Sequence, residues 1–401
     1  MNKKYLNTLS AAHLVTDIFQ GALPAMLPFL ISERNISYAS AALLIFAANA
    51  TSLIIQPIFG VYSDKISAPW SLPIGILLAG VGLGLTGIMP SFGAMFALTA
   101  ISGIGIALYH PEGARLTNKY SGKNKTSAVS IFAAGGNIGF ALGPILTTAC
   151  IMAFNLKGTL FLIIPAIIMS ILLFFNNKNI MASSNQIENN SSLKVNFEEK
   201  EKKDEWKPFA RLTATLLCRS TIFFGFNTFL TLYFMHVLNQ SELKGSIALS
   251  TLIIVGAVGT LFAGKLADKI GNKKIIIGGY ALLFPLLFLF LNIHNPILAY
   301  IVLIPMGMAL YAPYSPMVAL GQKYLPNHVG LASGITLGLG VTMGGVISPI
   351  LGLISDKYGI HAALSSLILI PLLAIVLAVK LPVPKADIVN QEETAVESQV
   401  S

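Results

Sequence analysis

The sequence predicts an all-α membrane protein made of two similar bundles of six helices. Apolar residues make up 54% of the 401 residues and charged residues only 11%, whereas a soluble domain typically carries about 25% charged residues. Several short patterns also occur twice, roughly 200 residues apart, which indicates a duplicated unit. In so apolar a chain, two parallel repeats are typical of a secondary transporter.

The duplication rests on four pairs of matching segments. In each pair, glycine and the residues around it recur in the same order, and the spacing within every pair is roughly 200 residues. Collinear matches at one spacing indicate two copies, each filling about half of the chain. The pairs are Gly60–Lys65 with Gly264–Lys269, Gly105–Pro111 with Gly307–Pro313, Gly139–Pro144 with Gly344–Pro349, and Ile18–Gly21 with Ile222–Gly225.

Twelve apolar runs provide the predicted membrane spans. The hydrocarbon core of a bilayer is roughly 30 Å thick, and a helix needs about 20 apolar residues to cross it. Glycine and proline inside such helices are tolerated because neighbouring helices satisfy the backbone. The runs cover 6–31, 40–62, 70–90, 91–113, 126–153, 158–175, 208–236, 246–266, 274–293, 295–320, 328–354 and 360–380.

The longest polar interruption separates the sixth run from the seventh. Residues 176–207 are rich in Asn, Ser, Lys and Glu and have no apolar periodicity, which is typical of a mobile linker. We therefore expect an N-terminal six-helix bundle over 1–175, a cytoplasmic linker over 176–207, a C-terminal six-helix bundle over 208–384 and a disordered tail over 385–401.

The basic residues set the expected orientation. The net charge is +9, and most lysines and arginines fall in the loops that share a side with both termini. This asymmetry places the termini in the cytoplasm by the positive-inside rule, and it explains the charge without nucleic-acid binding. The two cysteines lie in separate apolar runs and predict neither a disulfide framework nor a metal site. The basic residues outside this pattern are Arg34, Lys157, Lys244 and Lys357, together with Arg219 inside a span.

Several motifs of the first half resemble those of a known family. They are Ser10–Asp17, Gln56–Pro57, Asp64–Lys65 followed by Pro69–Gly75, Tyr109–Arg115 and Ser130–Pro144. With twelve spans and the repeated Gly-x-x-x-Asp-Lys turn, they resemble the major facilitator superfamily and, within it, the fosmidomycin resistance protein family of drug exporters. The resemblance implies the major facilitator fold and a multi-pass efflux transporter of the bacterial inner membrane, with no enzyme activity and no cofactor. We expect a monomer whose partners are a small-molecule substrate, protons and the lipid bilayer.

The first run carries polar side chains on one face. His13, Asp17 and Gln20 lie at positions i, i+4 and i+7 of a predicted helix, so they point in one direction. An ionisable group in lipid is expensive and indicates a functional site by default. A buried carboxyl group holds its proton more firmly than one in water, which suits a proton carrier, and His13 can share that proton. The alternative is a structural hydrogen bond between neighbouring helices.

The fourth run ends in a second polar group. Pro111 frees backbone carbonyls, which usually happens beside a cavity or a polar neighbour. Glu112 is either a second proton site with His110 or the partner of Arg115 at i+3. Thr99 stands where many proton-coupled antiporters of the superfamily carry an arginine, so that relay is not expected. A zinc site is not expected either, since no third and fourth ligand lie nearby in the sequence.

Arg219 lies about as deep in the seventh run as Asp17 lies in the first. A buried guanidinium needs an anion. That anion is either Asp17 or a phosphonate or carboxylate of the substrate, which the planar fork of donors on arginine would suit. A structural ion pair without substrate contact is the alternative. We expect a substrate site that contains Arg219, Gln20, Asn137 and Tyr311.

The turns after spans two and eight are expected to form a conformational latch. A carboxylate at such a turn can cap a neighbouring helix and pair with a nearby cation. These contacts would form in one access state and break in the other, whereas a plain turn is the alternative. The latch residues are Asp64, Lys65, Arg115, Asp268 and Lys269.

The fifth run resembles the antiporter motif of the superfamily's exporters. Gly139, Gly143 and Pro144 predict a groove for close helix contact that ends in a kink. We expect this groove to seal the outer part of the interface between the two halves.

The predicted function is a proton-coupled exporter. In this antiporter, a small anionic compound such as a fosmidomycin-like drug leaves while protons enter through Asp17, His13, Glu112 and His110. A proton-coupled importer of a small organic anion or a siderophore on the same fold is the first alternative. An intramembrane enzyme using His110 and Glu112 is the second, but it lacks a nucleophile motif and a metal set and leaves the duplication unexplained.

Overall fold

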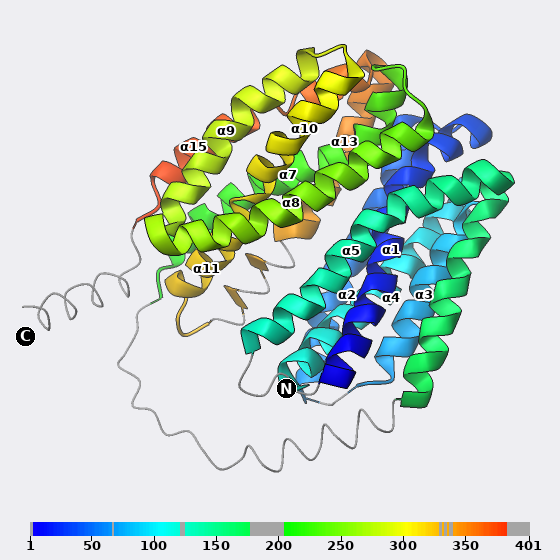
Figure 1. Cartoon of the computed structure of the whole chain (residues 1–401), viewed down its shortest axis with the longest axis horizontal. Helices are drawn as coiled ribbons and strands as arrows, with labels where there is room; N and C mark the ends of the chain where they lie inside the picture. Colours follow the sequence, from blue (N-terminus) through cyan, green and yellow to red (C-terminus); the bar gives the residue numbers. More distant parts are fainter. Residues whose placement is uncertain are drawn as a thin grey trace, which may run out of the picture.

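The computed structural model describes residues 3–65, 68–120, 125–176, 204–328, 331–332, 335–336 and 340–382. Within these ranges the chain is helical apart from short connections, and it forms no strand (Figure 1). The predicted all-α architecture is therefore confirmed. Most of the expected linker, 177–203, and the expected tail from 383 onward lie outside the described residues.

The first half of the described chain consists of six helical segments. Five are single helices, and the sixth begins as a 3-10 helix before it continues as an α-helix. All six contain a proline, which helices in lipid tolerate. The segments are α1 (Lys3–Arg34), α2 (Tyr38–Lys65), α3 (Ser71–Thr86), α4 (Phe92–Tyr120), α5 (Lys125–Phe154), and η1 (Asn155–Leu162) with a helix over 163–176.

The second half follows the same order with two interruptions. Pro313 separates α10 from α11 within the expected tenth span, because proline cannot donate a helical hydrogen bond. Turns over 366–369 divide the expected twelfth span. The segments are α7 (Trp206–His236), α8 (Glu242–Ile270), α9 (Asn272–Asn292), α10 (Pro296–Tyr311), α11 (Tyr314–Tyr324), α13 (Gly340–Tyr358), α14 (Ile360–Ser365) and α15 (Ile370–Val379).

Eight helical stretches of the described chain are long and apolar enough to cross a membrane. Among the other expected spans, α3 is only 16 residues long, α7 contains two arginines, and the eleventh span is described only in part. All of them nevertheless follow the predicted order. One boundary differs, since α7 begins at Trp206 and so includes the last two residues of the expected linker.

The two halves repeat one packing scheme. α1 packs on α5 as α7 packs on α13, α2 packs on α4 as α8 packs on α10, and α3 packs on α4 as α9 packs on α10. The interface between the halves obeys the same symmetry, because α2 contacts α13 and α5 contacts α8. This is the arrangement that a duplicated six-helix unit predicts.

Contacts between the halves gather at the end of the molecule away from the termini, which we call the opposite face. There, Asp356 of α13 accepts hydrogen bonds from the backbone N–H groups of Tyr38 and Ala39, at 2.7 and 3.0 Å, at the start of α2. Thr148 of α5 and Ser246 of α8 share a hydrogen bond of 2.6 Å. In Figure 1, α5 and α8 come together at this face and diverge toward the face where α1 begins and α15 ends, the terminal face.

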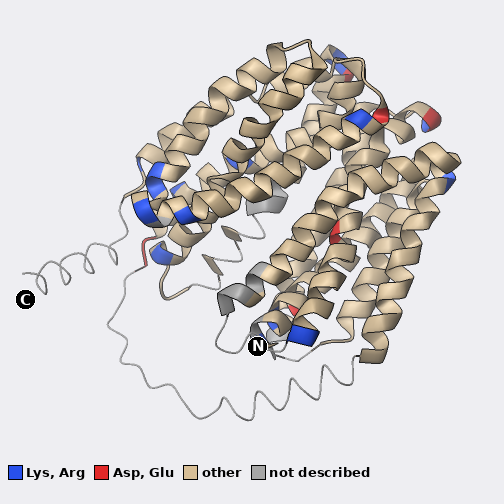
Figure 2. Ribbon diagram, in the orientation of Figure 1, with Lys and Arg blue, Asp and Glu red and all other residues tan. Residues whose placement is uncertain are grey.

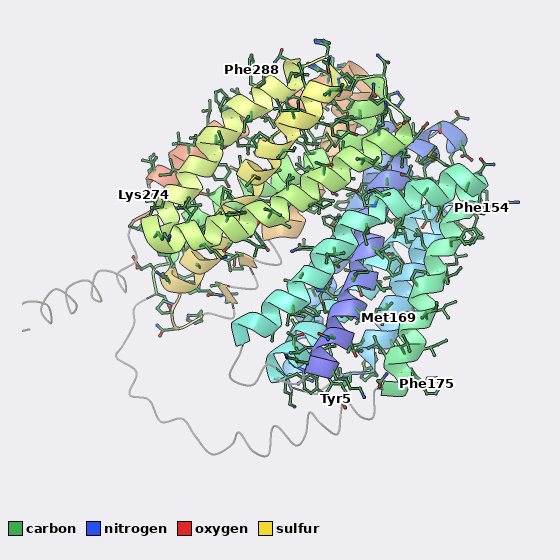
Figure 3. All side chains as sticks on the ribbon, viewed as in Figure 1. Tyr5, Phe154, Met169, Phe175, Lys274 and Phe288 are labelled. Carbon is green, nitrogen blue, oxygen red and sulfur yellow. The ribbon has the colours of Figure 1, made fainter. Side chains whose placement is uncertain are left out.

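The outer surface is suited to lipid. Phe154, Phe175 and Phe288 are 54%, 75% and 56% exposed and point outward (Figure 3). Lysine and arginine are almost confined to the helix ends, and most of those in the second half gather at the terminal face (Figure 2).

Candidate functional site

α1 and α5 approach each other closely along a row of glycines in α5. A Cβ atom added at Gly139 would lie 2.0 Å from the Leu14 carbonyl oxygen, and one added at Gly143 would lie 2.4 Å from that of Ile18. Only glycine permits this backbone contact, and Pro144 follows directly inside the helix. The predicted groove is therefore present. It faces α1 of the same half, contrary to the expectation that it seals the interface between the halves.

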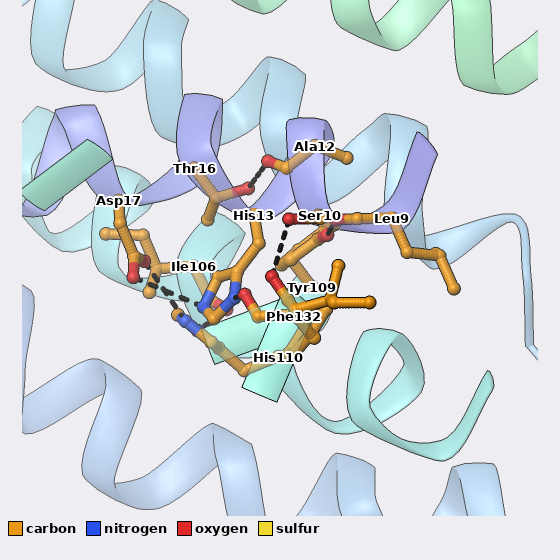
Figure 4. Close-up of polar contacts among 11 residues, drawn as sticks. Leu9, Ser10, Ala12, His13, Thr16, Asp17, Ile106, Tyr109, His110 and Phe132 are labelled. Atoms are coloured by element: carbon orange, nitrogen blue, oxygen red, sulfur yellow. Dashed lines mark hydrogen bonds and ion pairs between the residues drawn. The ribbon is translucent and has the colours of Figure 1, made fainter. Parts of the chain in front are cut away.

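α1 and α4 together supply three ionisable side chains, the His–Asp–His group of His13, Asp17 and His110 (Figure 4). Asp17 Oδ2 lies 3.2 Å from His13 Nε2, one turn earlier in α1. Asp17 Oδ1 lies 3.1 Å from His110 Nε2, which comes from α4. His13 and Asp17 are each 9% exposed. The polar face predicted for the first span therefore meets His110 of the fourth span at a single carboxylate.

Each imidazole is also fixed at its other nitrogen. His13 Nδ1 lies 2.8 Å from the carbonyl oxygen of Phe132 in α5, and His110 Nδ1 lies 3.0 Å from that of Ile106. A carbonyl oxygen can only accept a hydrogen bond, so both Nδ1 atoms donate. The Phe132 ring also stacks on His13 with the ring centres 4.0 Å apart.

Both Nε2 atoms consequently face oxygens of the same carboxylate. A neutral imidazole that carries its hydrogen on Nδ1 presents only a lone pair at Nε2, which an ionised carboxylate repels. Each contact between Nε2 and Asp17 becomes a hydrogen bond only when it holds a proton. The group can thus bind two protons at adjacent positions that are largely desolvated.

Gly136 of α5 leaves the space that this group occupies. A Cβ atom added there would lie 2.5 Å from His13 Cε1 and 2.6 Å from Asp17 Oδ2. Ligand atoms of the three side chains lie within 4.8 Å of one another, so they could also hold a divalent ion of the zinc type, although three ligands leave its coordination incomplete. Sequence spacing does not reveal this arrangement, because His110 lies 93 residues from Asp17.

Glu112, the other expected proton site, is paired with Arg115. Its side chain is fully buried and accepts hydrogen bonds from Arg115 Nε at 2.8 Å and from Nη2 at 2.7 Å. This two-point contact is the i+3 pairing that the sequence offered as one of two alternatives. Glu112 therefore lies outside the His–Asp–His group.

A cavity of about 150 Å³ lies between the halves, with Asp17 in its wall. Gln20 and Asn137, both expected to contact substrate, line it as well. A mostly apolar cavity with a few polar groups is the usual form of a small-molecule site. The polar lining residues that sequence reasoning missed are Asn49, Ser52, Ser102 and Asn227; no spacing rule links them, since they come from three helices of different runs.

Arg219 of α7 lies next to this cavity within a set of aromatic rings. Its guanidinium carbon is 4.6 Å from the ring centre of Tyr314, 5.0 Å from that of Tyr311 and 5.5 Å from that of Phe223. Its Nε donates to the Leu310 carbonyl oxygen at 3.2 Å. Arg219 is 3% exposed and forms no ion pair with any residue that the structure describes.

The structure does not bring Arg219 and Asp17 into contact, because Asp17 is held by the two histidines. Phe223 lines the cavity and packs against both Arg219 and Tyr311. The Tyr311 hydroxyl is buried and lacks a hydrogen-bond partner within the described part of the chain. Among the described residues, this buried cation has no anionic partner and this buried hydroxyl has no hydrogen-bond partner, and both are therefore suited to binding an anion.

The expected latch is described only in part. The structure gives the side chains of Arg115, which binds Glu112, and of Lys269, which is exposed near the end of α8. The side chains of Asp64, Lys65 and Asp268 are outside the described set. The latch therefore stays a prediction.

Two helical bundles around a mostly apolar central cavity with a few polar groups are typical of a membrane transporter. A family model of the Major Facilitator Superfamily matches residues 9–339, and the chain therefore belongs to that superfamily. The structure resembles that of a bacterial homolog of the human lysosomal transporter Spinster in an inward-facing and occupied conformation, with a TM-score of 0.79 and 13% identity over 94% of this chain and 96% of that one. The predicted major facilitator fold is confirmed.

Curated relatives extend over nearly the whole chain. The protein is 27% identical over 371 residues to the fosmidomycin resistance protein of Escherichia coli (strain K12), which covers 92% of this chain and 90% of the relative. It is also 27% identical over 381 residues to the uncharacterized MFS-type transporter YfnC of Bacillus subtilis (strain 168), covering 93% and 91%. The resemblance to the fosmidomycin resistance protein family is thus confirmed.

Proposed function

We propose that the protein is a proton-coupled exporter of small anionic compounds of the fosmidomycin type. It works as a monomer in the bacterial inner membrane, with both termini and the 176–207 linker in the cytoplasm. The relative named for fosmidomycin resistance supports a drug as substrate. The basic residues at the terminal face support the orientation, by the positive-inside rule.

The observation that carries the proposal is the His–Asp–His group in the wall of the central cavity. Its two Nε2–carboxylate contacts each need a proton, and Asp17 belongs to both the group and the cavity. Loading or emptying the group changes the charge beside the cavity by up to two units. In a site of low dielectric constant, such a change of charge strongly alters the electrostatic energy of a bound ion.

The conformation fits uptake of substrate from the side of the terminal face. The opposite face is held by Asp356 on the start of α2 and by Thr148 on Ser246. In the proposed cycle these contacts break when the halves rock, and the cavity then opens to the other side of the membrane.

Arg219 supports an anionic substrate. A phosphonate that displaces the Phe223 ring would reach the guanidinium and the Tyr311 hydroxyl, two buried groups that lack an anionic or hydrogen-bonded side-chain partner among the described residues. The planar fork of arginine donors matches phosphonate oxygens in two-point contacts. Gln20 and Asn137 would contact the uncharged part of the substrate from the first half.

The sign of the coupling distinguishes export from import. Antiport requires that protons and substrate exclude each other, which follows if hydrogen-bond donors of the substrate occupy the Asp17 oxygens. Import with protons is the second candidate, and electrostatics favour it, because a protonated group attracts an anion to the cavity. Export therefore predicts that affinity for the anion falls as the pH is lowered, whereas import predicts that it rises.

The deciding experiment uses proteoliposomes that contain the full chain and a phosphonate such as fosmidomycin. An imposed pH gradient, acidic on the side of the opposite face, should drive the phosphonate toward that acidic side. Reversing the gradient should reverse the flux, and a metal chelator should leave it unchanged. Movement of the phosphonate together with the protons would establish the importer, and flux that ignores the gradient would reject proton coupling.

A further inference from the structure

A groove of about 560 Å³ runs along the outer surface of the second half between α8, α9 and α10. Small residues on all three helices leave this space, among them Gly259 in α8, Gly278 in α9 and Ala309 in α10. Phe262 and Leu282 form part of its walls and are 65% and 52% exposed. The groove is separate from the central cavity and shares no lining residue with it.

Three lysines stand at the terminal-face end of this groove. Lys265 and Lys269 lie one turn apart on α8, and Lys274 lies in the first turn of α9. All three are exposed, and no aspartate or glutamate lines the groove among the residues that the structure describes. Figure 2 shows the basic cluster at this end of α8 and α9, and Figure 3 labels Lys274 within it.

This combination selects an amphipathic anion. Like charges one turn apart on a helix repel each other, so the cluster is stabilised by a negative group placed between them. A soluble anion would satisfy the lysines but would leave the apolar groove empty. A phospholipid satisfies both the lysines and the groove. Its phosphate lies at the same membrane depth as the lysines, and its acyl chain lies at the depth of the groove.

We propose that the groove is a binding site for one anionic phospholipid of the leaflet at the terminal face. The phosphate group lies among Lys265, Lys269 and Lys274, and one acyl chain lies along Gly278. A Cβ atom added at Gly278 would meet no atom within 4 Å, so the backbone there borders open space. All lipid tails are equally apolar, so the groove fixes the position of the acyl chain without selecting among lipids. The preference for anionic headgroups comes from the lysines.

The groove also borders the arginine site. Met308 and Ala309 line it, and the next two residues of α10, Leu310 and Tyr311, contact Arg219. A lipid bound in the groove therefore packs on the same turn of helix that holds the guanidinium.

Binding of phosphatidylglycerol to the purified full-length protein tests the proposal. Native mass spectrometry would count bound lipid, with phosphatidylcholine and inorganic phosphate as comparison ligands. We expect one tight phosphatidylglycerol, weaker phosphatidylcholine and no binding of phosphate alone. Replacing all three lysines with glutamine should weaken phosphatidylglycerol binding roughly 100-fold, from the attraction typical of each basic residue. Tight binding of phosphate alone, or equal binding of the two lipids, would overturn the proposal.

A steric variant tests the groove without changing charge. Gly278→Leu should fill the groove and weaken phosphatidylglycerol binding at least several-fold, and thermal unfolding should show that the helix is intact. Gly93→Leu, another glycine whose added Cβ meets nothing within 4 Å but which lies in α4, is the matched control. Glutamine at Lys3, Lys4 and Lys157, which lie outside the groove, is the control for charge. Loss of binding in the controls, or full binding in both test variants, would show that the lysines and the groove do not form the site.

Discussion

α1 and α7 occupy equivalent places in the two halves, yet they carry opposite charges with different surroundings. α1 holds Asp17 between two imidazoles, all of them groups that can gain or lose protons. α7 holds Arg219, whose charge is permanent, between aromatic rings. The two halves share one packing scheme, whereas in the proposed function their chemistry is divided between a proton site on α1 and an anion site on α7.

The difference in surroundings explains how the two sites can communicate without touching. Hydrogen bonds hold the His–Asp–His group, so its charge depends on how many protons it contains. Arg219 is held by one hydrogen bond to a backbone carbonyl and by cation–π contacts of about 2 kcal/mol each, which the charge-assisted hydrogen bonds of an anion can replace. A change of charge on one wall of the cavity therefore alters the affinity of the other wall for an anion.

The largest effect is expected from Asp17→Asn, which removes the proton site from this comparison. The amide has nearly the same shape and can still contact both imidazoles, but it cannot take up and release a proton. Flux driven by a pH gradient in proteoliposomes should fall to the level of empty liposomes, while substrate binding stays measurable and loses its pH dependence.

Glu33→Gln is the control for this substitution, since it makes the same chemical change at an exposed position. Normal gradient-driven flux in Asp17→Asn would show that Asp17 is structural and that Glu112 is the next candidate.

Arg219 substitutions test the other side of the comparison. Arg219→Ala removes charge-assisted hydrogen bonds to an anion, each worth about 1.5–3 kcal/mol, so affinity for a phosphonate should fall roughly 10- to 100-fold. Arg219→Lys keeps the charge but loses the planar fork, so its affinity should lie between those of Arg219→Ala and the wild type. Equilibrium binding of a phosphonate and of an uncharged analogue checks this, because affinity for the analogue should be nearly unchanged. Equal losses for both ligands would mean that Arg219 only supports the fold.

Gly136→Ala should damage the proton site while leaving the arginine site intact. The added methyl group would lie within 2.6 Å of both His13 and Asp17, and such overpacking costs about 1–3 kcal/mol. Thermal unfolding should show the loss of stability, and the pH dependence of transport should become shallower. Gly93→Ala is the matched control, because its Cβ would meet open space. If the two variants behave alike, the contact between α1 and α5 does not define the proton site.

Sequence periodicity predicts the spans and the polar face of α1, because both depend on spacing within one helix. His13 and Asp17 could be placed together for this reason. His110 could not, since its contact with Asp17 depends on how α4 is tilted against α1, and that tilt follows from packing. Around Arg219, Phe223 comes from the same helix at i+4 and Tyr311 was expected at this site, but Tyr314 was not, since it lies on α11 beyond the junction at Pro313.

The contacts of Asp356 are also beyond sequence prediction, because they join two halves in one of two access states. The sequence directed attention to a latch at Asp64 and Asp268, whose side chains the structure does not describe. The structure instead provides a described contact at the opposite face, where Asp356 caps the start of α2 across the interface.

The smallest expected effect comes from Asp356→Ala, which compares the two faces instead of the two halves. Losing a helix cap costs about 0.5–2 kcal/mol. The substitution destabilises only the state that is closed at the opposite face, where the contact exists. The population that is open at this face should therefore rise roughly 2- to 30-fold. Spin labels at Met152 and Ile247, in a protein with serine in place of Cys150 and Cys218, would report the distance between α5 and α8. Asp204→Ala is the control, because that carboxylate also accepts a backbone N–H, from Asn327, but within one half. A distance distribution that is unchanged in Asp356→Ala, or equally changed in both variants, would show that this contact is not the clasp and would return attention to Asp64 and Asp268.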